Sequence, residues 1–208
     1  MKVGVAIVGY SGHSFVASEI LMSVGFNING YFEEEEKENN PLNFKYLGSE
    51  DKMIADKVIN NEDYFVAVGD NLLRKKITLK MELHTKRKAI NAIDVSAAIS
   101  HSATIGKGVM IGPRAIINAS CIIGDGVICN SGCIVEHECV ISNFVHIAPG
   151  AILCGNIEIG ENSFIGAGSI IKQGVTVGAN CIIGAGTVVI KNISDNSKVV
   201  GNPARMIK

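Results

Sequence analysis

Apolar side chains recur at every sixth position through the second half of the chain, from residue 99 to residue 189. The residue four places after each of these anchors is small or aliphatic. Because successive side chains of a strand point to opposite faces, that residue and the next anchor, two places on, point to the same side. The pattern therefore predicts short strands around a shared apolar interior. The anchors are Ile99, Ile105, Ile111, Ile117, Ile123, Cys129, Val135, Ile141, Ile147, Leu153, Ile159, Ile165, Ile171, Val177, Ile183 and Val189.

Glycine directly follows the anchor in many of these hexads, which suits a corner where the backbone needs a positive φ. Short strands separated by tight corners describe a parallel β-helix. Hexapeptide repeats of this form are typical of the left-handed β-helix, in which three hexads make a triangular coil of about eighteen residues. We therefore expect a left-handed β-helix with about five coils within residues 99–208. The glycines in question are Gly106, Gly112, Gly124, Gly160, Gly166, Gly178 and Gly184.

The first half of the chain shows a different pattern, in which short apolar runs alternate with amphipathic stretches. Residues 2–8, 27–32 and 64–68 are predicted strands, with a brief further strand at 45–47. Helices are predicted over residues 15–24, over 49–58 with Ser49 as the N-cap, and from the Gly69–Asn71 turn to about Thr85. This alternation predicts a small parallel α/β sheet of Rossmann type over residues 1–85, joined to the β-helix by a connector at 86–98.

Glycine-rich and acidic segments follow the predicted strands of this first domain. Gly9 and Gly12 bracket the first turn, where backbone N–H groups at a helix N-terminus favour phosphate. Glu33 ends the second strand, where a carboxylate can accept hydrogen bonds from a ribose or a base. Gly69, Asp70 and Asn71 end the third strand at the same edge. A nucleotide cleft is one interpretation; the alternative is a solvated acidic loop beside a helix that Asp70 caps.

The corner glycines disappear over residues 129–158, where five consecutive hexads carry another residue. Within this interval lies the sequence Glu136-His137-Glu138. Because corners point outward, His137 is not predicted to be a core residue. A carboxylate bonded to one ring nitrogen fixes the tautomer and raises the basicity of the other nitrogen, as a general base requires. A solvated turn histidine is the alternative interpretation. The five replacements are Asn130, Glu136, Ser142, Ala148 and Cys154.

The eighteen-residue coil places Gly155 one level from His137, about 4.8 Å away along the stack. A glycine N–H at that point could meet a carbonyl oxygen that becomes negative during acyl transfer.

Outward-facing positions form a second apolar column, and such an exposed ladder is unusual on a soluble monomer. It predicts packing along the β-helix, most simply a homotrimer. His146 interrupts the neighbouring apolar column and is expected to line a cleft between subunits or to make an interface hydrogen bond. The ladder consists of Ile116, Ile134, Ile152, Ile170 and Val188.

Composition narrows the partners and the compartment. The 208 residues carry a formal net charge of −1, which gives no reason to expect nucleic acid or an anionic membrane surface as a partner. Five of the six cysteines fall on inward positions and Cys154 falls on a corner, so free thiols and a cytoplasmic location are expected. The apolar start of the chain has no cleavage site and is interpreted as a strand rather than a signal or membrane segment. No metal site is expected, because His101 and His137 lie two coils apart.

Four segments together resemble a known family over nearly the whole chain. They are Gly9–His13 (GYSGH), Val66–Ile77 (VAVGDNLLRKKI), Val135–Cys139 (VEHEC) and Gly201–Arg205 (GNPAR). They are similar to hexapeptide-repeat acyltransferases with an N-terminal nucleotide-sugar domain, of the bacillosamine N-acetyltransferase (PglD) and sialic acid O-acetyltransferase (NeuD) type. The pair Glu33-Glu34 stands where relatives more usually have two aspartates.

The resemblance implies an acetyl-CoA-dependent N-acetyltransferase acting on a nucleotide-linked 4-amino-deoxysugar. His137 would be the catalytic base and Glu138 the residue that orients it. The resemblance assigns His13, Glu33, Glu34 and Asn71 to the nucleotide sugar. The other residues expected to bind it are Gly9, Gly12, Gly69, Asp70 and Asn130. Acetyl-CoA would lie along the β-helix between two subunits, with His146, Gly155, Lys172, Lys191 and Arg205 as its contacts.

Three alternatives remain open at this point. A base with acetyl-CoA serves a hydroxyl as well as an amine, so O-acetylation of a sugar such as sialic acid is one. A metal-dependent hydratase built on the same β-helix is another. The third is a non-catalytic protein that binds sugar nucleotides.

Overall fold

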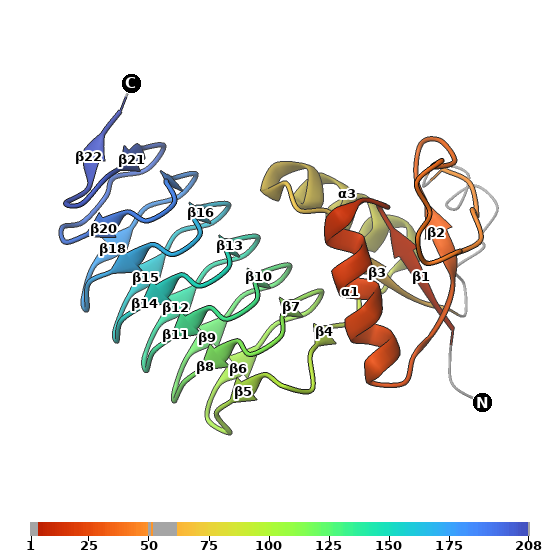
Figure 1. Ribbon diagram of the computed structural model, residues 1–208, viewed down its shortest axis with the longest axis horizontal. Helices are drawn as coiled ribbons and strands as arrows, with labels where there is room; N and C mark the ends of the chain where they lie inside the picture. The colour runs from red at the N-terminus through yellow and green to blue at the C-terminus, as the bar shows by residue number, and fades with distance from the viewer. Residues whose placement is uncertain (1–3, 50, 52–61, 208) are drawn as a thin grey trace. The chain divides into compact units, whose positions relative to one another are not determined.

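The computed structural model describes residues 4–49, 51 and 62–207. The chain forms two compact units, Met1–Val95 and Ser96–Lys208, and each is described by itself (Figure 1). The helix expected over residues 49–58 falls almost entirely outside the described residues. No helix in the described part of the chain is long and apolar enough to cross a membrane.

The first unit is a three-stranded parallel sheet with strand order β2-β1-β3. Val8 at the end of β1 pairs with Phe32 of β2 and with Val66 of β3, so the carboxyl ends of all three strands meet at one edge. The alternating α/β pattern with a parallel sheet is confirmed. The elements are β1 (Gly4–Val8), α1 (Gly12–Ser23), β2 (Asn27–Phe32), β3 (Asp63–Val66), α3 (Asn71–Thr85) and β4 (Ala92–Ile93).

The apolar runs of this unit are buried, as their composition predicts. Val5 to Val8 are at most 1% exposed, and Met81 of α3 is fully buried in the cluster on the sheet. The strand expected at residues 45–47 is instead a single parallel bridge between Tyr31 and Tyr46. Gly30 permits this approach, because a Cβ there would lie 2.3 Å from the carbonyl oxygen of Lys45.

The second unit is the expected left-handed parallel β-helix, in which the two-residue strands between residues 98 and 189 pair with strands eighteen positions away (Figure 1). Ile134 pairs with Ile116 on one side and with Ile152 on the other. One face holds six strands, so the helix has about six turns rather than five. The expected count was wrong because five eighteen-residue intervals separate six levels.

The strands of the β-helix are short and regular. They are β5 (Ala98–Ile99), β6 (Thr104–Ile105), β7 (Met110–Ile111), β8 (Ile116–Ile117), β9 (Ile122–Ile123), β10 (Ile128–Cys129), β11 (Ile134–Val135), β12 (Val140–Ile141), β13 (His146–Ile147), β14 (Ile152–Leu153), β15 (Glu158–Ile159), β16 (Phe164–Ile165), β17 (Ile170–Ile171), β18 (Thr176–Val177), β19 (Ile182–Ile183), β20 (Val188–Val189), β21 (Lys198–Val200) and β22 (Arg205–Met206). The last two form an antiparallel pair at the C-terminal end. Cys121, Cys129, Cys133, Cys139 and Cys181 are free and buried in the interior, as expected, whereas Cys154 is half-buried.

The reason predicted for the corner glycines was wrong. The positive φ falls two residues later in the hexad, at positions such as Gly108, Asn156 and Glu138. Glycine follows the anchor because the backbone of the next coil lies too close for a side chain. A Cβ on Gly160 would lie 2.4 Å from the backbone nitrogen of Ala179.

We therefore expect Gly160→Ala to lower the free energy of unfolding by an amount at the upper end of the 1–3 kcal/mol that is typical of overpacking, about 3 kcal/mol. Gly168→Ala is the matched control, because Gly168 has open space around it and a positive φ of 64°. Its cost should be about 1 kcal/mol, from the left-handed conformation alone. Thermal or denaturant unfolding of both variants measures the difference, and equal losses would contradict this account of coil spacing.

Candidate functional site

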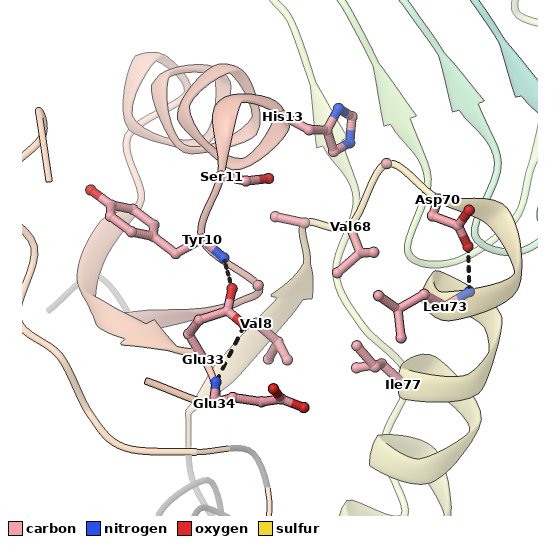
Figure 2. A pocket seen from close by; sticks show the side chains of 13 residues that line it. Val8, Tyr10, Ser11, His13, Glu33, Glu34, Val68, Asp70, Leu73 and Ile77 are labelled. Atoms are coloured by element: carbon pink, nitrogen blue, oxygen red, sulfur yellow. Dashed lines mark hydrogen bonds between the residues drawn. The ribbon is translucent and has the colours of Figure 1, made fainter. Parts of the chain in front are cut away.

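A cavity of about 490 Å³ lies at the carboxyl edge of the sheet in the first unit (Figure 2). Six residues expected at the nucleotide line it: Gly9, His13, Glu33, Glu34, Gly69 and Asp70. Gly12 and Asn71, also expected there, are not among the lining residues. One wall is apolar and was not anticipated from the sequence; it consists of Val8, Val68, Leu73 and Ile77.

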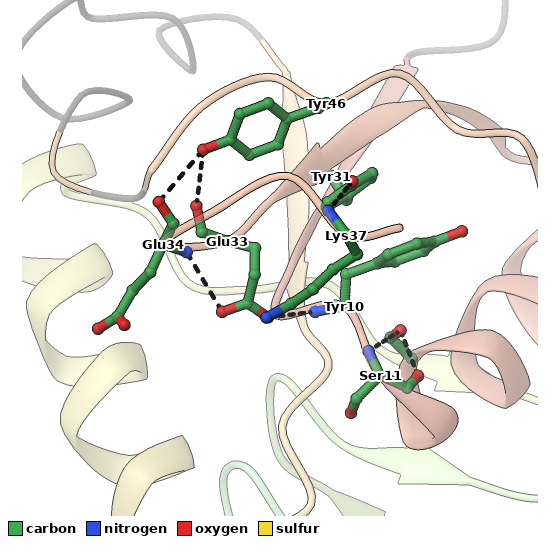
Figure 3. A network of polar contacts seen from close by, with 8 residues as sticks. Tyr10, Ser11, Tyr31, Glu33, Glu34, Lys37 and Tyr46 are labelled. Atoms are coloured by element: carbon green, nitrogen blue, oxygen red, sulfur yellow. Dashed lines mark hydrogen bonds and ion pairs between the residues drawn. The ribbon is translucent and has the colours of Figure 1, made fainter. Parts of the chain in front are cut away.

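Glu33 is tied to the backbone of the first turn rather than left free for a ligand (Figure 3). Its Oε2 accepts a hydrogen bond from the N–H of Tyr10 at 2.9 Å, and its Oε1 accepts one from the N–H of Glu34 at 3.2 Å. Lys37 Nζ lies 4.0 Å from Oε2. Glu33 therefore fixes the glycine turn against the end of β2.

In Glu34, by contrast, the main chain is held and the carboxylate is not. The Tyr46 hydroxyl donates to the backbone carbonyl oxygens of Glu33 and Glu34, at 3.2 and 3.3 Å, and so fixes the main chain at this point. The Glu34 side chain extends along the rim of the cavity toward Ile77 (Figure 2). Its carboxylate has no hydrogen-bond or ion-pair partner among the described residues, so it remains available to a ligand.

Arg74 lies beneath the loop that follows β3 and is the main polar residue that sequence reasoning missed. It is 1% exposed and donates to the carbonyl oxygens of Val68 and Gly69 and to Asn71 Oδ1, at 3.1, 3.0 and 2.8 Å. Burial lowers its pKa to about 10, and the nearby Asp70 carboxylate opposes the change. Asn71 thus has a structural partner. Arg74 shares the inward stripe of α3 with Ile77 and Met81, and this helical spacing could have revealed it.

Asp70 caps α3, as the alternative to a nucleotide-binding role predicts. Its Oδ1 accepts a hydrogen bond from the N–H of Leu73 at 2.8 Å. The residue also lines the cavity, so capping and a place at the rim coincide.

His13 lines the cavity at the N-terminus of α1, and its ring is neutral there. Burial, together with the positive charge of Arg74, lowers the pKa of His13 from 6.5 to about 4. Near neutral pH its ring therefore acts as a neutral hydrogen-bonding group.

A second candidate site lies on the β-helix, at the corner that carries His137. Its Nδ1 lies 3.0 Å from Glu138 Oε2, and the two side chains are 49% and 66% exposed. Because an ionised carboxylate only accepts hydrogen bonds, Nδ1 carries the proton and Nε2 is left as the basic nitrogen. Glu138 has a φ of 60°, in the left-handed region that Gly or Asn occupies at most equivalent corners. Backbone strain at such a residue is typical of functional sites.

Gly155 lies directly against the His137 ring, as the eighteen-residue register predicts. A Cβ on Gly155 would lie 2.4 Å from His137 Cε1 and 2.6 Å from Nε2. The N–H of Asn156 donates to the carbonyl oxygen of His137 at 2.8 Å and joins the two corners. Only glycine leaves room for the imidazole in this orientation.

Glu136, which precedes His137, forms a polar pair with Asn118 that supports the same corner. Asn118 Nδ2 donates to Glu136 Oε2 at 2.9 Å across one coil. The Cys121 thiol lies 3.0 Å from the carbonyl oxygen of Glu136, its acceptor. Asn118 and Glu136 are eighteen residues apart, so the repeat could have revealed the pairing, which sequence reasoning did not make.

The remaining expected residues lie elsewhere on the β-helix. His146 is 9% exposed; its Nε2 is 3.2 Å from Asn130 Nδ2, and its ring meets Phe164 edge-on at 5.1 Å. Lys172, Lys191 and Arg205 are exposed. Lys191 lines a cavity of about 170 Å³ with Pro203 and Ala204, next to Arg205 in the sequence. Among the described residues no group of His, Cys, Asp or Glu is arranged to hold a metal ion.

Comparison with known families separates the two halves of the chain. The model described as the PglD N-terminal domain matches residues 4–81. The family model described as bacterial transferase hexapeptide (six repeats) matches residues 138–173. The family model described as hexapeptide repeat of succinyl-transferase matches residues 156–191.

Solved structures match the chain over nearly its full length. A histidine variant of perosamine N-acetyltransferase from Caulobacter crescentus, in complex with CoA and GDP-perosamine, is 33% identical, with a TM-score of 0.94 over 99% of this chain and 97% of that one. The acetyltransferase domain of PglB from Neisseria gonorrhoeae FA1090, in complex with acetyl coenzyme A, is 33% identical, with a TM-score of 0.93 over 100% of both chains. WeeI from Acinetobacter baumannii AYE is 25% identical, with a TM-score of 0.87 over 98% of this chain and 99% of that one.

The neutral state of His13 generates a pH prediction. Because its folded pKa of about 4 lies below the unfolded value of 6.5, the unfolded chain binds the extra proton between these values. The stability that His13 contributes is therefore present above pH 6.5 and is lost as the pH falls toward 4. The difference corresponds to about 3 kcal/mol.

Denaturant unfolding of the wild type and of His13→Gln between pH 7.5 and 4 measures this effect. The substitution should flatten the pH dependence of the free energy of unfolding. Parallel curves would show that His13 titrates normally.

Proposed function

Since the chain belongs to the PglD-type hexapeptide-repeat sugar acetyltransferases, we propose that it transfers the acetyl group of acetyl-CoA to the amino group of a nucleotide-linked amino sugar. The finer assignment is a 4-amino-deoxysugar used in surface glycan synthesis. The observation that carries the proposal is the full-length similarity to the perosamine N-acetyltransferase bound to CoA and GDP-perosamine. The His137–Glu138 pair supports it independently, because a base is what attack by an amine requires.

His137 acts in this proposal as the general base. The sugar nitrogen attacks the thioester carbonyl carbon, and Nε2 takes the proton that nitrogen loses. The C–S bond then breaks, and the imidazolium returns the proton to the CoA sulfur. Glu138 holds Nδ1–H throughout and stabilises the cationic ring at 3.0 Å.

Gly155 is the proposed contact for the oxyanion. Its N–H has no acceptor among the described residues, and it lies beside the His137 ring. A backbone donor near the base can meet the negative charge of the tetrahedral intermediate without reorganising.

CoA is proposed to follow the β-helix toward its C-terminal end. The small cavity beside Lys191, Pro203 and Ala204 supports this path, with Lys172, Lys191 and Arg205 as cationic partners for the phosphates. His146, packed between Asn130 and Phe164, is assigned to the thioester end of the cofactor. The nucleotide sugar is assigned to the cavity of the first unit.

The proposed assembly is a homotrimer packed along the outward apolar ladder. Ile170 is 39% exposed in the isolated chain, and Ile116, Ile134, Ile152 and Val188 are partly exposed beside it. Continuous apolar surface of this kind favours an interface. A cytoplasmic location is part of the same proposal, and the six free cysteines support it.

His137→Ala should lower turnover by about 10²–10⁴-fold, because that is the usual contribution of a general base. Release of free thiol from acetyl-CoA, measured with a panel of nucleotide-linked amino sugars, tests this. His101→Ala is the matched control, because His101 is also an exposed histidine of the β-helix.

The control should retain wild-type turnover, and both variants should keep the oligomeric state of the parent. Near-normal turnover of His137→Ala would exclude the residue as the base. Thiol release with a hydroxyl acceptor and not with any amine would exclude N-acetylation in favour of O-acetylation.

Ile134→Glu should dissociate the trimer, because a carboxylate within the ladder would be buried at the interface. Light scattering coupled to size-exclusion chromatography measures the mass. Ile122→Glu, an outward position that is 50% exposed on another face, is the control and should leave the mass unchanged. A trimer in both variants would move the interface to a different surface.

A further inference from the structure

The cavity of the first unit has two chemically different ends, and this polarity bears on which nucleotide enters. His13 and Ser11 lie at the end formed by the N-terminus of α1, whereas Glu34 lies at the other end beside Ile77 (Figure 2). The described residues that line the cavity include three carboxylates, Glu33, Glu34 and Asp70, and no Lys or Arg, so positive charge reaches the cavity only from beneath its lining.

The α1 end suits a diphosphate. Arg74 is fully buried beneath Val68 and Gly69, and its guanidinium donates to both of their carbonyl oxygens. Its positive charge therefore lies under this end of the cavity, close enough to His13 to help keep that ring neutral. A helix N-terminus adds partial positive charge in the same place.

The opposite end presents a carboxylate on a segment of main chain that is held in place, with a side chain that is exposed and free to bind. Tyr46 holds the main chain of Glu33 and Glu34, while the Glu34 side chain has no partner among the described residues. The adjacent carboxylate cannot substitute for it, because both oxygens of Glu33 accept backbone N–H groups. Val68, Leu73 and Ile77 give the planar face of a base an apolar surface.

A carboxylate at the base end discriminates between nucleobases by their hydrogen-bond donors. Guanine presents two adjacent donors, N1–H and the 2-amino group, which match the two oxygens of a carboxylate. Uracil and thymine present one N–H flanked by two carbonyl oxygens, and these repel a carboxylate. Adenine and cytosine present an amino group next to a ring-nitrogen acceptor.

We propose that Glu34 is the base-reading residue of this cavity and that the sugar nucleotide is a guanosine diphosphate derivative. The inference rests on the proposed function for the presence of a sugar nucleotide, and it adds the identity of the base. Glu33 holds the turn, and Glu34 accepts from the guanine edge.

Calorimetric binding of free GDP, UDP and IDP to the full chain tests the proposal without any acetyl transfer. GDP should bind about 10–100-fold more tightly than UDP, as expected for hydrogen bonds to a charged group. IDP keeps N1–H and lacks the 2-amino group, so it should bind about 10-fold more weakly than GDP.

Glu34→Gln should lower the affinity for GDP by about 10–100-fold and remove the advantage of GDP over IDP, because an amide offers one acceptor where the carboxylate offers two. Its affinity for UDP should stay at the wild-type level or rise, because the amide removes the charge that repels the uracil carbonyl oxygens and can donate to one of them. Retained UDP binding also shows that the cavity is intact. Glu35→Gln is the matched control, because Glu35 is an exposed neighbour that does not line the cavity, and it should change nothing.

Three results would overturn the base assignment. Glu34→Gln could weaken the binding of GDP and of UDP equally, which would assign the carboxylate to the ribose. The wild type could bind UDP as tightly as GDP, or it could fail to bind GDP. Thiol release with a uridine-linked amino sugar would then leave the proposed acetyl transfer standing. Conversely, Glu34-dependent GDP binding without thiol release from any amino sugar would overturn the proposed function and leave the base assignment intact.

Discussion

Hydrogen bonding between successive coils is the constraint on which the β-helix and its candidate site depend. Between residues 98 and 189 each strand pairs in parallel with a strand eighteen residues away, and the corners repeat the contact, as from Asn156 to His137. Because the levels lie only one strand spacing apart, the backbone above a corner decides whether a side chain fits. Glycine is required at Gly160 for this reason, and at Gly155 because the His137 ring of the neighbouring coil occupies the space of a side chain. The spacing that builds the fold therefore also fixes the His137 ring against a glycine.

In the first unit the comparable constraint is the satisfaction of buried polar groups. Arg74 lies fully buried under the loop after β3, and it is tolerated because two carbonyl oxygens and an amide oxygen accept its hydrogen bonds. Glu33 does the same for the turn after β1. These contacts hold two loops at one sheet edge and leave between them a cavity with the Arg74 guanidinium beneath one end and the Glu34 carboxylate at the other.

Two adjacent, chemically identical residues illustrate how structure separates roles. Both carboxylate oxygens of Glu33 accept hydrogen bonds from backbone N–H groups, whereas those of Glu34 accept none from the described residues. The corner of the β-helix shows a related division between Glu136, which accepts from Asn118, and Glu138, which accepts from His137. In both places one carboxylate supports the fold and its neighbour faces the proposed chemistry.

The sequence by itself determined the β-helix, the parallel α/β sheet, the buried cysteines and the contact between His137 and Gly155, because all of these follow from strict periodicity. Only the tertiary structure decided why glycine follows many of the anchors, that Asn71 bonds to Arg74, and that Glu33 and Glu34 differ. Periodicity specifies which residues share a face or a level. It cannot specify which backbone donor a given side chain reaches, because that depends on how loops from separate strands meet in space.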